Sequence, residues 1–109
     1  LLKLEDISHM TNTNISKDQI KFTNLHKSFF SDLNNTKFEI TDNKVMIFES
    51  SSQSSDPASV ELEHLNNSYI VYYWDGYSLA DRYESNDYND AILEFKKFAK
   101  RLAKNLRKF

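Results

Sequence analysis

The stretch "SYIVYYWDGYSLADRYES" (residues 68–85) decides the fold, because it reads as two β-strands joined at one Asp-Gly turn. Its aromatic residues fall on both faces of the first strand, whereas a strand with one solvated face is normally apolar on one side only. A two-residue turn at Asp75-Gly76 pairs Trp74 with Tyr77. That register predicts a core face made of Ile70, Tyr72, Trp74, Tyr77, Leu79 and Tyr83.

The preceding strand, "ASVELEHL" (residues 58–65), alternates and sets the second register. Val60, Leu62 and His64 lie on one face, and Glu61 and Glu63 on the other. A two-residue connection would place both carboxylates against the predicted core face, at a cost of several kcal/mol. A three-residue loop at 66–68, with an Asn in the left-handed conformation, avoids this cost. The second sheet face is then expected to carry Glu61, Glu63, Tyr69, Val71, Tyr73, Arg82 and Glu84.

The flanking segments predict a helix at each end of this sheet. Residues 15–33 place Phe22, Leu25, Phe29 and Leu33 on one helical stripe flanked by His26 and Phe30, and an Asn34-Asn35 stop follows. Ser16 with Gln19 suits a capping box, and Ile15 with Ile20 a hydrophobic staple. Residues 37–50 predict a hairpin, and residues 50–57 a surface loop.

Residues 85–109 give the clearest helical periodicity in the chain, with an apolar stripe from Tyr88 to Phe109. Ser85, Asn86 or Asp87 can cap its start. The predicted fold class is α+β, in one domain of residues 1–109. A four- to five-stranded antiparallel meander is covered on one face by an N-terminal helix and a long C-terminal helix.

The charge of the chain is strongly segregated. All 16 acidic residues lie within residues 1–95 beside 7 basic ones, a net of −9, whereas the other 7 basic residues lie between Lys96 and Lys108. Such asymmetry concerns partners rather than the fold. The absence of cysteine fits a reducing compartment and removes thiolate chemistry, and no apolar run is long enough to span a membrane.

The sequence carries no convincing catalytic, cofactor or metal motif. His9, His26 and His64 lack metal-ligand spacing, and a single glycine makes a phosphate-binding loop implausible. Glu61 and Glu63 form a possible carboxylate pair, but an exposed alternating strand accounts for them. We therefore expect a protein that is not an enzyme and that uses no cofactor and no small-molecule substrate.

The chain from Tyr69 to Leu106 resembles immunity proteins of bacterial polymorphic-toxin and contact-dependent-inhibition systems, in which an aromatic hairpin is followed by an acidic turn and a helix. The segment that shows this pattern is "YIVYYWDGYSLADRYESNDYNDAILEF" (residues 69–95). The resemblance covers about the last third of the chain. It implies a cytoplasmic, non-catalytic inhibitor that binds a cognate toxin domain, often a nuclease, and blocks its active site.

Two interpretations of the acidic and aromatic face stay open. It is either a partner-binding surface or an ordinary exposed sheet face on which Tyr69 stacks against Arg82. If it binds a partner, the expected contacts are Glu61, Glu63, Tyr69, Tyr73, Glu84 and, at the adjoining turn, Asp75. The rival class is a nucleic-acid-binding module that uses Lys100, Arg101 and Lys104 of the basic terminal helix, although the acidic remainder of the chain would repel phosphates.

Overall fold

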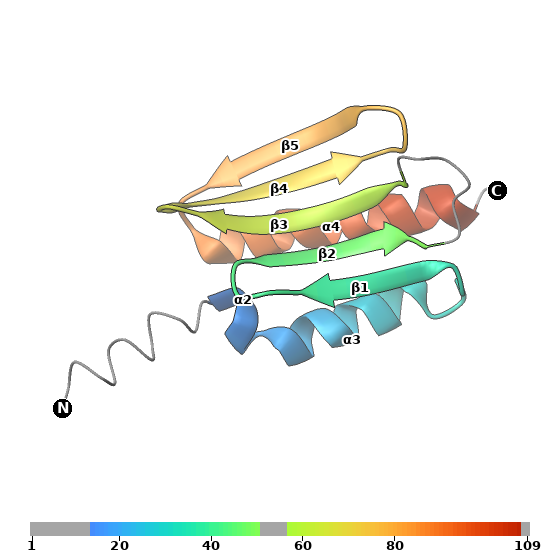
Figure 1. The fold of residues 1–109 in the computed structure, drawn as a ribbon, viewed down its shortest axis with the longest axis horizontal. Helices are drawn as coiled ribbons and strands as arrows, with labels where there is room; N and C mark the ends of the chain where they lie inside the picture. Colours follow the sequence, from blue (N-terminus) through green and yellow to red (C-terminus); the bar gives the residue numbers. More distant parts are fainter. Residues whose placement is uncertain (1–13, 51–56, 108–109) are drawn as a thin grey trace.

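A computed structural model describes residues 14–50 and 57–107 of the chain. The five strands form one antiparallel sheet in the order β1-β2-β3-β4-β5, so each strand pairs with its neighbour in the sequence (Figure 1). The elements are α2 (Asn14–Lys17), α3 (Gln19–Phe30), β1 (Thr36–Ile40), β2 (Lys44–Glu49), β3 (Ser59–Leu65), β4 (Ser68–Trp74), β5 (Leu79–Ser85) and α4 (Tyr88–Arg107).

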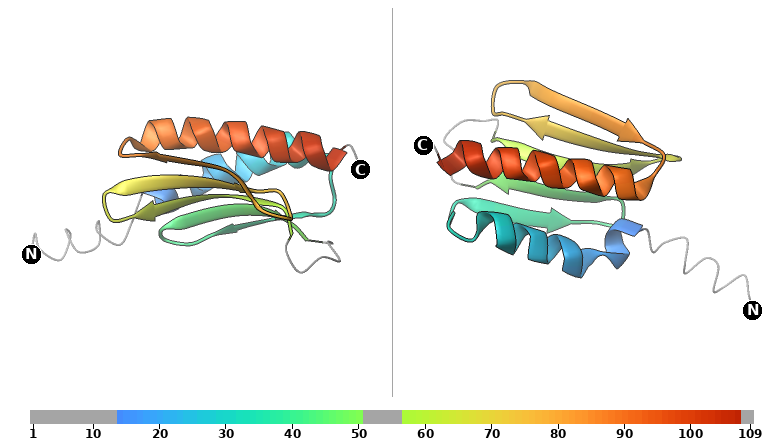
Figure 2. Two further views of the ribbon diagram at one scale, coloured as in Figure 1. Left: turned by 90° about the horizontal axis from the view of Figure 1, so that it is seen from above. Right: turned by 180° about the vertical axis from the view of Figure 1, so that it is seen from behind.

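Both long helices lie on the same face of the sheet (Figure 2). Helix α4 packs against β3, β4 and β5, and α3 packs against β1 and α4. The α+β class, the meander and the covering of one face by two helices are therefore as predicted. The expected loop at 50–57 lies largely outside the described residues, and so does the end of the predicted helical stripe at 109.

The N-terminal helix begins differently from the prediction, because a break at Asp18 divides it into α2 and α3. Ser16 lies inside α2, so the predicted capping box is wrong. Ile15 is fully buried but Ile20 is 76% exposed, so the predicted staple is also wrong. The hydroxyl of Tyr88 donates a hydrogen bond of 2.7 Å to Asp18 Oδ2, which ties the break to the start of α4. Burial and this carboxylate raise the pKa of Tyr88.

The apolar stripe of α3 is confirmed. Phe22, Leu25 and Phe30 are buried, and Phe29 and Leu33 pack against the core from partly buried positions. The helix ends at Phe30, before the predicted Asn-Asn stop.

The connection between β3 and β4 corrects the predicted register. Leu65 pairs with Ser68, so the loop has the two residues Asn66 and Asn67, and Asn66 takes the left-handed conformation at φ 58°. Glu63 therefore pairs with Ile70. The carboxylates on β3 are still not buried in the core, because the face of β4 that they join is not the core face.

The pairing of β4 with β5 also differs from the prediction. Trp74 pairs with Leu79, so the connection is the four residues 75–78 rather than a two-residue turn, and the register shifts at Tyr73/Trp74. Asp75 Oδ1 accepts hydrogen bonds of 2.9 Å from the backbone N–H groups of Tyr77 and Ser78. These bonds close the wider turn and lower the pKa of Asp75. Asp75 thus has a structural role at this turn.

The helices cover the face that carries Tyr69, Val71 and Tyr73, the opposite of the predicted core face. Among the predicted core residues of this hairpin, Tyr83 packs against the core, but Tyr77 is 92% exposed in the turn. The buried core consists of Ile15, Phe22, Leu25, Phe30, Val45, Ile47, Ala58, Val60, Leu62, Tyr69, Val71, Tyr73, Ala91, Phe95, Phe98, Ala99, Leu102 and Ala103. His64 lies on the core side as predicted and stacks on Tyr69, with ring centroids 4.3 Å apart.

Helix α4 follows the predicted periodicity and begins at a cap. Asp87 Oδ1 accepts a 2.9 Å hydrogen bond from the backbone N–H of Asn89, and Ser85 Oγ accepts one of 3.0 Å from that of Asp87. Among the described residues, no helix combines the length and hydrophobicity that a membrane crossing requires.

Candidate partner-binding surface

The face of the sheet opposite the helices, here called the open face, carries large apolar side chains among charged ones. Strand pairing places two rows on it: Glu61, Tyr72 and Arg82 in one, and Glu63, Ile70 and Glu84 in the next. The open face comprises Lys37, Glu39, Lys44, Met46, Phe48, Ser59, Glu61, Glu63, Ile70, Tyr72, Trp74, Leu79, Arg82 and Glu84.

The structure places the predicted contact residues on two different faces. Glu61, Glu63 and Glu84 lie on the open face, in positions that a partner can reach. Tyr69 and Tyr73 were predicted to accompany them, and that placement is wrong, because they are only 7% and 2% exposed beneath the helices. The alternative stacking of Tyr69 on Arg82 is wrong for the same reason.

Internal contacts hold the two buried tyrosines. The hydroxyl of Tyr69 accepts a 3.0 Å hydrogen bond from Asn14 Nδ2, and the hydroxyl of Tyr73 accepts a hydrogen bond from the side-chain amide of Asn105. The guanidinium of Arg101 lies 4.8 Å from the centre of the Tyr73 ring. Both tyrosines therefore act in folding rather than in surface recognition.

Two aromatic residues that the sequence prediction assigned to the core take the tyrosines' place on the open face. Tyr72 and Trp74 are partly exposed on β4. Ile70, which precedes them on the same face of the strand, is only 5% exposed and pairs with Glu63 on β3 and Glu84 on β5. The alternation of β3, with a two-residue turn, contained the signal that would have identified these residues.

The carboxylates of the open face repel one another in a partly desolvated setting. Burial raises the pKa of Glu61, and the negative charge of Glu63 raises it further, while Lys44 opposes both effects with its Nζ 3.8 Å from Glu61 Oε2. Burial and the same carboxylates raise the pKa of Tyr72. An added cation would relieve this repulsion.

A hollow of about 280 Å³ lies beside Trp74 on the open face. This volume lies just below the range of small-molecule sites, so it suits one inserted side chain better than a free metabolite. Its lining residues are Glu39, Met46, Phe48, Pro57, Ser59 and Trp74.

The arginines of α4 are engaged within the chain. Arg101 Nη1 lies 2.8 Å from Asp81 Oδ2, and Arg107 Nε lies 2.7 Å from Asp32 Oδ2. Hydrogen bonds from these guanidinium groups lower the pKa of Asp81 and of Asp32. Arg101, which the nucleic-acid hypothesis needs for phosphate binding, would have to leave Asp81 first.

Within residues 14–50 and 57–107, no group of three His, Asp or Glu side chains has the arrangement of a metal site. Comparison with known proteins gives no match: no family model fits the sequence, and no curated protein and no solved structure is significantly similar to it.

Proposed function

We propose that this chain is a non-catalytic immunity protein that binds and neutralises a toxin domain, covering its active site with the open face. The observation that carries the proposal is the combination on that face of partly exposed Tyr72 and Trp74 with the carboxylates of Glu61, Glu63 and Glu84. The proposed target class is a nuclease, because nuclease clefts are basic.

The two kinds of side chain would contribute to binding in different ways. Tyr and Trp supply large contact areas at a low entropy cost and dominate the binding energy of many interfaces. Carboxylates complement a basic cleft, raise the association rate and disfavour partners of the wrong charge. The net charge of −9 over residues 1–95 acts in the same direction at long range.

The proposed surface lies on a rigid element. Its side chains stand on adjacent strands of a five-stranded sheet whose other face is fixed by α3 and α4 (Figure 2). Little ordering is then needed on binding, which favours affinity.

The test begins with pull-down from the native host and with the product of the adjacent gene. A recovered toxin domain is titrated against the wild type and against Tyr72→Ala and Trp74→Ala, each of which should weaken binding by about 2 kcal/mol or more. Glu61→Gln together with Glu63→Gln should mainly lower the association rate and flatten its dependence on salt.

Lys97→Ala is the matched control, because Lys97 is exposed on α4, on the other side of the molecule. It should leave affinity unchanged. The proposal fails if no protein partner is recovered. It also fails if a recovered toxin binds the open-face variants as tightly as the wild type.

A further inference from the structure

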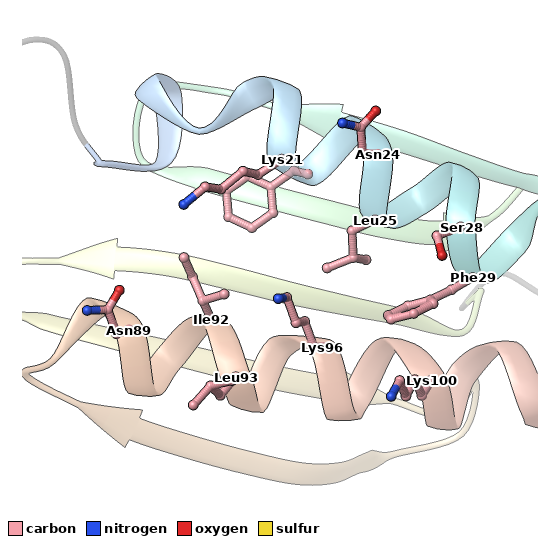
Figure 3. Close-up of a pocket in the computed structure, with 11 residues that line it drawn as sticks. Lys21, Asn24, Leu25, Ser28, Phe29, Asn89, Ile92, Leu93, Lys96 and Lys100 are labelled. Carbon is pink, nitrogen blue, oxygen red and sulfur yellow. The ribbon is translucent and has the colours of Figure 1, made fainter.

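A groove of about 780 Å³ runs between α3 and α4, on the opposite side of the molecule from the open face (Figure 3). Its α3 wall runs from Lys21 to Phe29, and its α4 wall from Asn89 to Lys100. At 1.5 Å per residue, these walls are roughly 12 and 17 Å long, the length of two to three helical turns.

The groove has an apolar floor that the protein leaves partly uncovered. Leu25 and Phe29 of α3 and Ile92 and Leu93 of α4 line it, and Leu93 is 57% exposed. Leu25 is buried and Phe29 and Ile92 are partly buried, so Leu93 is the exposed part of this apolar lining.

The charged residues of the groove are all cations: Lys21, Lys96 and Lys100. Within the described part of the chain, Lys96 and Lys100 form no ion pair, in contrast to Arg101 and Arg107 on the same helix. The Lys100 ammonium lies 5.5 Å from the centre of the Phe29 ring, at the edge of the apolar floor.

From this arrangement we propose that the groove binds an acidic amphipathic helix of a protein partner. The helix would lay its apolar stripe along the floor and place carboxylates against Lys96 and Lys100 on one side and Lys21 on the other. The open form of the groove suits a helix better than an enclosed small molecule. Phosphates would use the lysines but would leave the apolar floor uncovered, so a nucleic acid fits less well. This site is independent of the proposed function on the open face.

The test uses a fluorescein-labelled 15-residue peptide with leucine on one helical face and glutamate on the other, titrated by fluorescence anisotropy. Saturable binding is expected, and the double variant Lys96→Glu/Lys100→Glu should weaken it at least tenfold. Leu93→Ser should also weaken it, and this exposed substitution leaves the buried core intact. Lys97→Glu, a single lysine-to-glutamate change on the same helix outside the groove, should alter the dissociation constant less than twofold.

Two further probes complete the experiment: the same peptide with lysine in place of glutamate, and a labelled single-stranded oligonucleotide. Neither should bind in the groove. The proposal is overturned if the acidic peptide does not bind, or if its binding is insensitive to the groove variants while their circular dichroism melts show a folded protein. Binding of the oligonucleotide in place of the peptide, lost in the double variant, would likewise overturn it in favour of a nucleic-acid site.

Discussion

Truncation of Tyr73 to alanine should be among the most destabilising single changes in the sheet. Its side chain is 2% exposed, its ring lies 6.3 Å from that of Phe98, and its hydroxyl is bonded to Asn105. Truncation of a large aromatic residue in a core costs about 3–5 kcal/mol, out of a total stability of about 5–15 kcal/mol for a typical domain. At about 4 °C or more per kcal/mol, the melting temperature should fall by at least about 12 °C.

Trp74→Ala provides the contrast, because Trp74 lies on the open face one residue further along β4. Its loss removes cross-strand contacts with Ser59 and Leu79, worth about 1 kcal/mol. Urea unfolding followed by far-ultraviolet circular dichroism measures both variants, since Trp74→Ala removes the only tryptophan and with it that fluorescence signal. Tyr73→Phe, which keeps the ring, should cost only about 1 kcal/mol. If Trp74→Ala proves more destabilising than Tyr73→Ala, the register described here is wrong.

Three further predictions concern single residues. The pKa of Glu61 is raised in the folded state, so ionisation of this carboxyl destabilises the fold as pH rises through that pKa. Glu61→Gln should therefore raise the melting temperature at pH 7. This increase in melting temperature should vanish near pH 3, where Glu61 is protonated in both states. Burial lowers the pKa of His26, which stacks on Phe30 and Phe38, so stability should decline as pH falls below the unfolded-state value of about 6.5. If the melting temperature of a His26→Gln variant falls as steeply between pH 7.5 and 5 as that of the wild type, protonation of His26 is not the cause of the decline. Asp87→Ala removes the cap of α4 and should cost about 0.5–2 kcal/mol in urea unfolding, whereas an unchanged midpoint would show that the cap contributes nothing.

The parts of the fold with one apolar face could be predicted from the sequence. The stripe of α4 from Ala91 to Leu102 and the alternation of Val60 and Leu62 in β3 left only one way to bury apolar area. Local hydrophobic periodicity was sufficient in these elements.

Strand β4 could not be oriented by the same means, because its two faces are almost equally hydrophobic. Tyr69, Val71 and Tyr73 on one face are about as apolar as Ile70, Tyr72 and Trp74 on the other. The Asp-Gly pair, moreover, suggested a two-residue turn. The hydrogen bonds of the Asp75 side chain close a four-residue turn instead. The faces of β4 are fixed instead by β3, because Glu61 pairs with Tyr72 and Glu63 with Ile70, on the face away from the core.

The candidate site was predicted only in part for this reason. Glu61 and Glu63 belong to β3, whose alternation is unambiguous, and their placement on the sheet face away from the core was correct. The predicted aromatic contacts belong to β4, whose faces are exchanged relative to the prediction. Tyr72 and Trp74 therefore lie on the open face in place of Tyr69 and Tyr73. The groove between α3 and α4 depends on how far apart two helices lie, which no local pattern in the sequence reports.

The meander order also determines how the chain folds during synthesis. Each strand pairs with its neighbour in the sequence, so the hairpins close short loops and can form as the chain emerges from the ribosome. Helix α4 follows all five strands, yet it covers Val60, Leu62 and Val71. Until residues 91–103 are released, the nascent sheet exposes its core face. We therefore expect docking of α4 to complete folding, and ribosome-bound chains stalled before it to bind chaperones.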